Sequence, residues 1–310
     1  MTDTRTPRVE ASATDRASDR AAADSGLTVA ELAELAGVAQ EAAVAGGERL
    51  NHHFGRLSAV REKGRAGDLV TEADLAAEAV VLELLASRTP ELGVIAEENG
   101  LRPGARDGLR WCVDPLDGTT NYAHGYPFFG CSVGLLWHDT PLLGALAVPA
   151  MGDLYWAAPG HGAWRNGQRI HVSDGQELGE ALLVTGFAYD RTSRIDNNYA
   201  EFAWFTHRTR GVRRAGAAAV DLACVACGCL DGYWERGLSP WDLAAGVVLV
   251  EQAGGVVRNY DGSPLDLLSG RLIACTPLLL QAMVDGLARC QPLQGAAYGA
   301  PELDRWQGAP

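Results

Sequence analysis

Two aspartates three residues apart, Asp114 and Asp117, mark the segment of this 310-residue chain with the clearest chemical potential. They follow a short apolar run, and Pro115 stiffens the chain between them. Gly118 then permits a tight turn, and the hydroxyl of Thr119 stands where a helix could begin. Amides at a helix start attract anions. Carboxylates beside such amides therefore favour a site where cations lie between protein and anion.

The same segment could instead form an ordinary turn whose carboxylates are only solvated. Further acidic residues in apolar surroundings weigh against that alternative: Glu97 and Glu98 after an apolar run, Asp74 at a predicted helix start, and Asp242 beside a tryptophan. Asp74 and Asp242 each have a local explanation too, because a first-turn acid caps a helix or is favoured by its dipole. We predict a site of converging carboxylates, with these alternatives open.

The elements that must position these residues alternate between helices and strands, as in a layered α/β or α+β fold. A Thr28-x-x-Glu31 capping box predicts a first helix beginning near Thr28, and a second helix follows Thr71. Its predicted buried side chains are Leu75, Ala79, Leu82 and Leu85 or Ala86. Predicted strands are Leu92–Ala96, Trp111–Val113, Val133–Trp137, Leu142–Val148, a hairpin of Tyr155–Ala157 and Ala163–Trp164, Ala181–Thr185, Gly232–Glu235 and Arg271–Ala274. Further predicted helices are Asn198–Thr209, Ala217–Leu230, Trp241–Ala253 and Pro277–Arg289.

Composition limits the classes of protein. The net charge of -13 argues against an extended nucleic-acid footprint, and no apolar run is long enough to span a membrane. We expect a disordered N-terminal tail over residues 1–26, and a single domain over 27–290 with halves of about 27–150 and 151–290. Residues 291–310 are expected to form a loose C-terminal tail.

The seven scattered cysteines and the lack of a secretory signal predict free thiols in a reducing compartment. Cys224-x-x-Cys227-x-Cys229 is similar to half of a zinc site. No second Cys or His pair stands at a matching spacing, so the segment is interpreted as a buried, alanine-rich helix.

Four motifs in order resemble those of the inositol monophosphatase family of magnesium-dependent, lithium-sensitive phosphatases. Its main signature, Trp-x-Val-Asp-Pro-x-Asp-Gly-Thr-x-Asn, matches Trp111–Asn121 position by position. The second, Trp-Asp-x-Ala-Ala-Gly, matches Trp241–Gly246. Asp68–Asp74 and Ala96–Glu98 match as well, and the resemblance runs from about residue 29 to 289.

This resemblance implies a layered αβαβα sandwich of the inositol monophosphatase and fructose-1,6-bisphosphatase type. It also implies two to three Mg²⁺ ions per site. Glu97, Asp114 and the carbonyl of Leu116 would hold the first ion. Asp114 would bridge to a second ion, held also by Asp117 and Asp242. Oxygen ligands of this kind are those that magnesium prefers.

The catalytic roles implied by the resemblance fall on Thr119, Asp74 and Glu97. Thr119 would orient the attacking water with Asp74 as its partner, while Asp74 and Glu97 would support a third ion through water. Groups implied to bind substrate are Asp117, Gly118, Thr119, Gly216, Ala217, Ala218, Glu235 and Asp242. The family's usual Gly-Ser-Ala is Gly-Ala-Ala here, so one hydroxyl near the substrate is missing. Lys63, the only lysine, matches a family loop position, but could equally be a solvated residue.

The implied function is hydrolysis of a small polyol phosphate, first of all myo-inositol 1-phosphate, by a cytoplasmic homodimer that binds neither nucleic acid nor membrane. Histidinol phosphate, fructose 1,6-bisphosphate and a 3′-phosphoadenosine nucleotide are alternative substrates, and a regulatory scaffold is an alternative of another class. Other phosphatase chemistries lack their motifs, because the chain has no Cys-x5-Arg, no Asp-x-Asp and no Gly-Lys-Ser/Thr.

Overall fold

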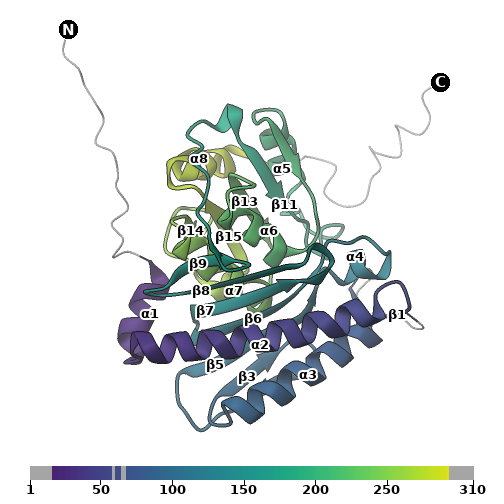
Figure 1. The fold of residues 1–310 in the computed structure, drawn as a ribbon. Coiled ribbons are helices and arrows are strands. Elements are labelled where there is room, and N and C mark those ends of the chain that lie inside the picture. The colour runs from purple at the N-terminus through teal and green to yellow at the C-terminus, as the bar shows by residue number, and fades with distance from the viewer. Residues whose placement is uncertain (1–15, 58–59, 64–67, 293–310) are drawn as a thin grey trace.

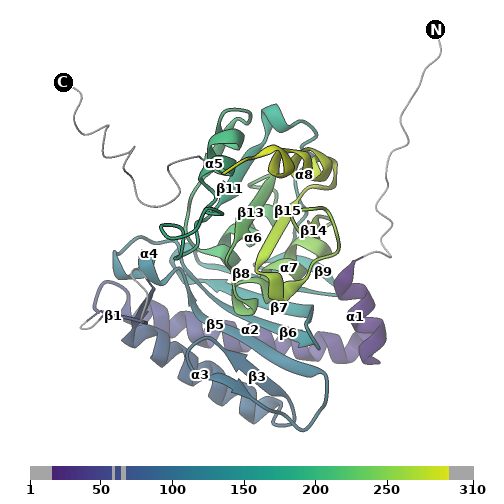
Figure 2. The same cartoon turned by 180° about the vertical axis from the view of Figure 1, so that it is seen from behind.

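Helices and sheets alternate in five layers in this protein (Figures 1 and 2). A computed structural model describes residues 16–57, 60–63 and 68–292. Helices α2 (Val29–His53) and α3 (Glu72–Arg88) cover one face of a large sheet. Helices α6 (Ala218–Ala226) and α7 (Pro240–Gln252) lie between that sheet and a smaller one, and α5 (Tyr199–Thr206) and α8 (Leu280–Arg289) lie outside the smaller sheet. The predicted αβαβα sandwich is confirmed.

Eight strands of the described residues form the large sheet in the order β10-β9-β8-β7-β6-β5-β3-β4. All neighbours are antiparallel except β3 and β5. The bounds are β3 Gly93–Ala96, β4 Gly100–Arg102, β5 Leu109–Asp117, β6 Gly130–Trp137, β7 Thr140–Val148, β8 Asp153–Ala158, β9 Gly162–Arg165 and β10 Gln168–Arg169. The predicted strands here are confirmed, although Trp111–Val113 is the middle of a longer strand.

The smaller sheet has the order β12-β11-β13-β15-β14 among the described residues. Its strands are β11 Leu182–Thr185, β12 Gly211–Arg213, β13 Gly232–Arg236, β14 Val256–Arg258 and β15 Arg271–Cys275. Strand β11 is parallel to β12 and β13, whereas β15 is antiparallel to both its neighbours. The remaining short strands, β1 (Val60–Glu62) and β2 (Leu69–Thr71), pair with each other, and the short helix α4 (Thr119–Ala123) follows β5.

A bulge interrupts β5 at the two predicted aspartates. Asp114 pairs with Ser132 and Asp117 with Gly130, so three steps along β5 oppose two along β6. Pro115 has no amide hydrogen to give to the ladder, which explains why the irregularity falls here. Residues three apart on a regular strand point to opposite faces. The extra residue removes that alternation and lets both carboxylates serve one site.

The buried face predicted for α3 is partly wrong. Leu75 is 51% exposed and Ala79 is exposed, whereas Asp74 and Glu78 are fully buried. Apolar periodicity assigns carboxylates to the surface. Here Asp74 and Glu78 lie four residues apart on one helix face, and each accepts a backbone hydrogen bond, Asp74 from Thr71 and Glu78 from Glu98. The capping boxes at Thr28 and Thr71 are confirmed.

The expected disordered tail is wrong for residues 17–25, which form helix α1 (Ala17–Ser25). The helix packs on β7 and β6 (Figure 1). Its start is held by Glu251 near the end of α7. The buried Glu251 carboxylate accepts bonds from the Ser18 hydroxyl at 2.6 Å and from the Ser18 amide at 3.0 Å. A small alanine-rich helix buries little apolar surface, so its sequence resembles a tail. Residues 1–15 and 293–310 of the two expected tails lie outside the described residues.

We expect Ser18→Ala to lower the free energy of unfolding by about 1–3 kcal/mol, because the buried Glu251 carboxylate loses its shortest hydrogen bond. Urea unfolding followed by circular dichroism measures the change. Ser87→Ala is the control, since that exposed serine donates its hydroxyl to the Leu84 carbonyl oxygen of its own helix. Equal effects of the two substitutions would contradict a stabilising role for the α1 contact.

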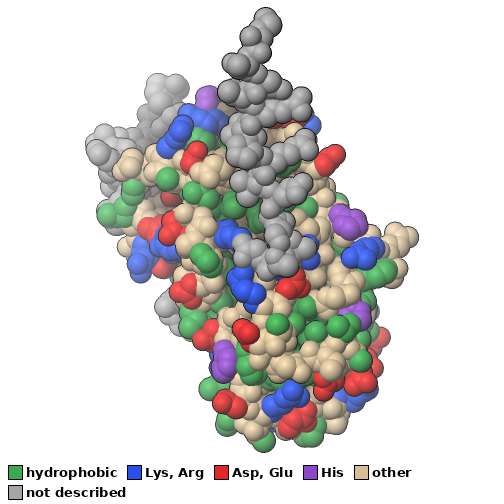
Figure 3. Space-filling model, turned by 90° about the vertical axis from the view of Figure 1, so that its left-hand side faces the viewer, with side chains coloured by type: hydrophobic (Ala, Val, Ile, Leu, Met, Phe, Trp, Pro, Cys, Tyr) green, Lys and Arg blue, Asp and Glu red, His purple; other side chains and the backbone are tan. Residues whose placement is uncertain are grey.

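Over the described residues, every helix is too short or too polar to cross a bilayer. On the parts of the face in Figure 3 that are coloured by side-chain type, basic side chains are interspersed with acidic ones.

Candidate active site

The hydroxyl of Thr119 links helix α4 to helix α3 and to strand β5. Thr119 is the first residue of α4, and its Oγ1 lies 3.2 Å from Asp74 Oδ1 and 3.0 Å from the Leu116 carbonyl oxygen. The other oxygen of Asp74 accepts hydrogen bonds from the amide of Thr71 at 2.8 Å and from its hydroxyl at 2.5 Å. Asp74 is thus both the cap of α3 and the partner of Thr119, so its two interpretations are not exclusive.

Asp114 and Asp117 of β5 are buried, and Asp242 at the start of α7 is half-buried. The three carboxylates lie close enough together for their charges to interact. Burial, and then the negative charges of Glu97, Asp117 and Asp242, raise the pKa of Asp114 well above its ordinary value. Burial and the nearby Glu97 likewise raise the pKa of Asp242. Asp242 also caps α7 by accepting the Ser239 amide at 2.7 Å. Mutual repulsion of this kind is relieved when a cation binds between the groups.

Asp117 lies against the start of α6. Its Oδ2 accepts the Val220 amide at 3.1 Å, and the amides of Ala218 and Ala219 also lower the pKa of its carboxyl. Burial outweighs these amides and raises the pKa of Asp117 to about 7. The dipole of α6 is therefore directed at a predicted metal ligand.

The turn after Asp117 brings the Gly216–Ala218 segment to the site. Gly118 has a φ of +88°, and a Cβ there would lie 3.0 Å from both the Ala217 side chain and the Phe128 carbonyl oxygen. Only glycine combines this backbone with so close an approach. Asn121 then donates to the carbonyl oxygens of Phe128 at 2.8 Å and Ala215 at 2.9 Å. The structural role of Asn121 was not evident from the motif.

Glu97 and Glu98, at the end of β3, contact the single lysine of the chain. The Lys63 ammonium lies 2.8 Å from Glu97 Oε1 and also pairs with Glu98. Burial raises the pKa of Glu98 to about 7, even though Lys63 lowers it. Glu78 on α3 accepts the Glu98 amide at 2.9 Å. Lys63 is therefore a half-buried partner of the acidic site and not a solvated residue.

Glu235, on β13 of the smaller sheet, lies near Asp117. It is 8% exposed on β13, and Tyr233 donates its hydroxyl to Glu235 Oε2 at 2.6 Å. Burial raises the pKa of Glu235 to about 7 against the lowering effect of Tyr233 and Arg214. The neighbouring Arg236 forms its ion pairs with Asp190 at 2.6 Å and Asp196 at 3.6 Å.

Two residues near the site were missed by sequence reasoning. Tyr189 is 46% exposed, and partial desolvation together with the charges of Asp68 and Glu97 raises the pKa of its hydroxyl. Asp221, in the first turn of α6, is buried, and burial with the charge of Glu235 raises its pKa. Neither stands in a motif, and only the folding of β11, α6 and β13 together brings them near the carboxylates.

The donor set fits a hard divalent cation, because it consists of carboxylate and carbonyl oxygens without histidine or thiolate. Within the residues that the structure describes, no three acidic, histidine or cysteine side chains already stand as a formed metal site. The positive charge beside Glu97 is the Lys63 ammonium group. Glu97 would have to exchange Lys63 for a metal ion in order to act as a ligand.

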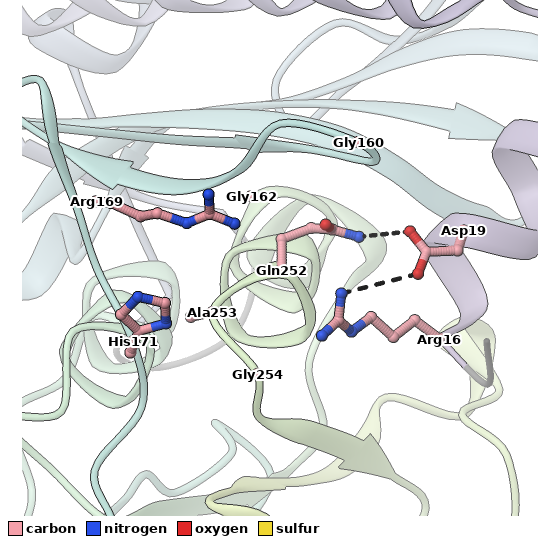
Figure 4. Close-up of a pocket in the computed structure, with 9 residues that line it drawn as sticks. All are labelled: Arg16, Asp19, Gly160, Gly162, Arg169, His171, Gln252, Ala253 and Gly254. Atoms are coloured by element: carbon pink, nitrogen blue, oxygen red, sulfur yellow. Dashed lines mark hydrogen bonds and ion pairs between the residues drawn. The ribbon is translucent and has the colours of Figure 1, made fainter. Parts of the chain in front are cut away.

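A separate cavity of about 290 Å³ lies at the other end of α7 (Figure 4). It contains none of the predicted site residues. Arg16, which precedes α1, forms an ion pair with Asp19 of that helix, and Gln252 donates to Asp19 at 2.8 Å. The acidic site and this cavity are therefore separate parts of the molecule.

A layered α/β sandwich with paired acidic motifs at the strand and helix ends defines a class of metal-dependent phosphatases. The family model for the inositol monophosphatase family matches residues 31–291. An inositol-1-monophosphatase of Synechocystis sp. is 50% identical over 251 residues, which cover 81% of this chain and 88% of that protein. A fructose-1,6-bisphosphatase/inositol-1-monophosphatase of Aquifex aeolicus is 41% identical, over 75% of this chain and 89% of that one.

Among solved structures, the inositol monophosphatase of Anabaena (Nostoc) sp. superposes with a TM-score of 0.78 and 46% identity, covering 84% of this chain and 98% of that one. The chain belongs to the inositol monophosphatase family. Its helix α1 precedes the residues that the family model matches.

Proposed function

We propose that this chain is a magnesium-dependent phosphomonoesterase that hydrolyses a small polyol phosphate, with myo-inositol 1-phosphate as the first candidate. The observation that supports it most is the convergence of Asp114, Asp117 and Asp242, whose burial and mutual repulsion favour a bound cation. Glu97, these three aspartates and the Leu116 carbonyl would hold two to three Mg²⁺ ions. When bound, such ions screen the phosphate charge and lower the pKa of a coordinated water.

The residues of the chain would then orient the attacking water. The Thr119 hydroxyl has one hydrogen, directed at Asp74 or Leu116, and keeps a lone pair that can accept a hydrogen bond from water. Asp74 is held by Thr71 in turn, which fixes the direction of that hydroxyl. The amides of Gly118 and Thr119 would bind phosphate oxygens, since they stand at the start of α4.

Glu235 and the segment from Gly216 to Ala218 would face the alcohol part of the substrate. Within the described residues, the hydroxyl of Tyr233 is the one hydrogen-bond donor to Glu235, and it uses Oε2. Oε1 therefore keeps lone pairs for substrate hydroxyls. A polyol satisfies such an acceptor better than a purine nucleoside, whose binding would need an aromatic platform.

A phosphate-release screen over inositol 1-phosphate, fructose 1,6-bisphosphate, histidinol phosphate and a 3′-phosphoadenosine nucleotide tests this proposal. Fructose 1,6-bisphosphate is the main competitor, because the Aquifex relative carries both names. We expect release that requires Mg²⁺, stops in EDTA and is inhibited by lithium. Absence of release from every substrate would favour the regulatory scaffold. We further propose a cytoplasmic homodimer, as the resemblance implies; sedimentation velocity tests the dimer.

Glu235→Gln should lower kcat/KM for inositol 1-phosphate by roughly 10–100-fold, because a hydrogen bond to a charged acceptor contributes about 1.5–3 kcal/mol. Hydrolysis of p-nitrophenyl phosphate, which has no polyol hydroxyl, should change much less. The measurement is the ratio of the two losses. Glu180→Gln, at an exposed glutamate, is the control. Equal losses on both substrates would mean that Glu235 supports the metal site instead.

A further inference from the structure

Three cysteines lie together at the end of α6, outside the site described above. The helix ends at Ala226, so the predicted helix Ala217–Leu230 is wrong over its last four residues, and Cys229 is exposed instead of buried. The residues after Ala226 turn back on the helix through backbone hydrogen bonds. The amide of Gly228 donates to Val225 and that of Cys229 to Cys224, each at 3.0 Å. The sequence motif that resembles half of a zinc site is therefore a tight turn. Its third cysteine projects beyond the helix.

This turn brings two of the sulfur atoms face to face. The Sγ atoms of Cys227 and Cys229 are 3.4 Å apart, with the Cys227 thiol as donor. Gly228 between them has a φ of +74°, and a Cβ there would lie 3.1 Å from the His171 carbonyl oxygen and 3.2 Å from the Ser173 amide nitrogen. The segment behind the turn thus supports a conformation that only glycine adopts readily, and the two thiols are held within reach of a bond.

The two thiols differ in environment. Cys229 is exposed and Cys227 is half-buried. Burial raises the pKa of the Cys227 thiol to about 11, so this sulfur is protonated near neutral pH. Cys229 is therefore the accessible nucleophile and Cys227 its internal partner.

A zinc ion is a poorer explanation of the same three residues. Structural zinc sites need four ligands, and among the described residues no group of three or more ligating side chains is arranged to hold a metal. Cys224 is partly buried on the helix, and its carbonyl oxygen accepts a hydrogen bond from the Cys227 thiol at 3.5 Å.

We propose that Cys227 and Cys229 form a thiol–disulfide exchange site that reacts with low-molecular-weight disulfides such as oxidised glutathione. The Cys229 thiolate attacks one sulfur of the disulfide, forming a mixed disulfide and releasing one thiolate. The Cys227 sulfur then attacks the Cys229 sulfur, its proton passes to a released thiolate, and the second small thiol leaves. The protein loses two electrons and two protons, and the small disulfide is reduced to two thiols. Closure between residues two apart gives a strained bond that reductants open easily.

The test uses the full-length reduced chain, incubated with oxidised glutathione, quenched with acid and alkylated under denaturing conditions. Intact mass should show that two of the seven thiols are lost without a glutathione adduct. Dithiothreitol should restore all seven. Cys227→Ser should stop at a glutathione adduct, and Cys229→Ser should resist the reagent. Cys224→Ser is the matched control and should behave like the parent chain.

Three results would overturn the proposal. One is a parent chain that keeps seven thiols. Another is an adduct that accumulates without closure, and the third is loss of closure in the Cys224→Ser chain, which would assign the bond to a different pair. Thermal unfolding followed by circular dichroism verifies that each serine variant is folded. The thiol count of the parent chain needs no substitution, so a parent chain that keeps all seven thiols would overturn the proposal even if a variant fails to fold.

Discussion

Asp114→Asn is expected to reduce magnesium-dependent phosphate release by about a thousand-fold or more, while the protein remains folded. The proposed role of Asp114 is to bridge two cations, so its neutralisation weakens both positions at once. Lewis-acid stabilisation of the transition state by metal ions is worth several kcal/mol, and about 1.4 kcal/mol corresponds to each factor of ten. No other substitution proposed for this chain has so large an expected effect.

The metal-free variant should be at least as stable as the parent chain. Asp114 is 2% exposed and is repelled by Glu97, Asp117 and Asp242, so asparagine removes an unfavourable charge. The bond that Asp114 Oδ1 accepts from the Leu116 amide at 3.0 Å can still form with the amide oxygen. Thermal unfolding in EDTA, with and without added Mg²⁺, measures this. We expect the stabilisation by Mg²⁺ to disappear in the variant.

Asp153→Asn provides the control, because Asp153 is also a buried aspartate but pairs with Arg165 at 2.7 Å, in β8 away from the acidic site. It should lose stability and keep its turnover per folded molecule. Unchanged phosphate release in folded Asp114→Asn protein, or full activity of the parent chain in excess EDTA, would contradict the metal-dependent reaction.

The stability of the metal-free protein should fall as the pH rises from about 4 to about 7, and Mg²⁺ should reverse that fall. Burial raises the pKa values of Asp117 and Glu235 from 3.8 and 4.5 to about 7. Between those limits the folded chain holds more protons than the unfolded chain, so the free energy of unfolding decreases with increasing pH. The direction is opposite to that of a paired surface carboxylate.

The effect should be on the order of several kcal/mol for the two groups together, since one pKa unit corresponds to about 1.36 kcal/mol. Ligand carboxylates must lose their protons to bind a metal, so the stabilisation by Mg²⁺ should be larger at pH 8 than at pH 5.5. Urea unfolding at both pH values, with Mg²⁺ or EDTA, gives the four free energies. A Mg²⁺ effect that is independent of pH would contradict the cation site.

Asp117→Asn separates this linkage from a general effect of pH. The variant lacks one of the two titrating groups, so its metal-free stability should depend less steeply on pH than that of the parent chain. The amides of α6 would still have an oxygen to bond, which limits other losses. A steeper pH dependence in the variant would mean that groups elsewhere cause the effect.

The local parts of this protein were determined by its sequence. Thr28 and Thr71 mark helix starts because a hydroxyl and an acid three residues later satisfy the first amides of a helix wherever they occur. The order of strands and helices followed from apolar runs and turn residues in the same way. The candidate ligands were equally visible, because the order of acidic residues in the motifs does not depend on the fold.

Other features depend on contacts between distant segments and could not be read from local patterns. Helix α1 is held in place by Glu251, which lies more than two hundred residues away in the sequence. Helix α3 can bury Asp74 and Glu78 because the Thr119 hydroxyl and the Glu98 amide donate hydrogen bonds to their carboxylates. Apolar periodicity places such carboxylates at the surface. The free-energy cost of burying a carboxylate depends on its hydrogen-bond partners, and these are known only from the tertiary structure.

The site itself was decided at the tertiary level. A bulge beside Pro115 turns two aspartates of one strand toward each other, and the packing of α6 then directs its amides at Asp117. Lys63 reaches Glu97 across 34 residues, and Arg236 forms an ion pair with Asp190. Sequence determined which charges this chain carries. The tertiary structure determined which of them are buried close together, and burial at short range is what makes their mutual electrostatic energy large.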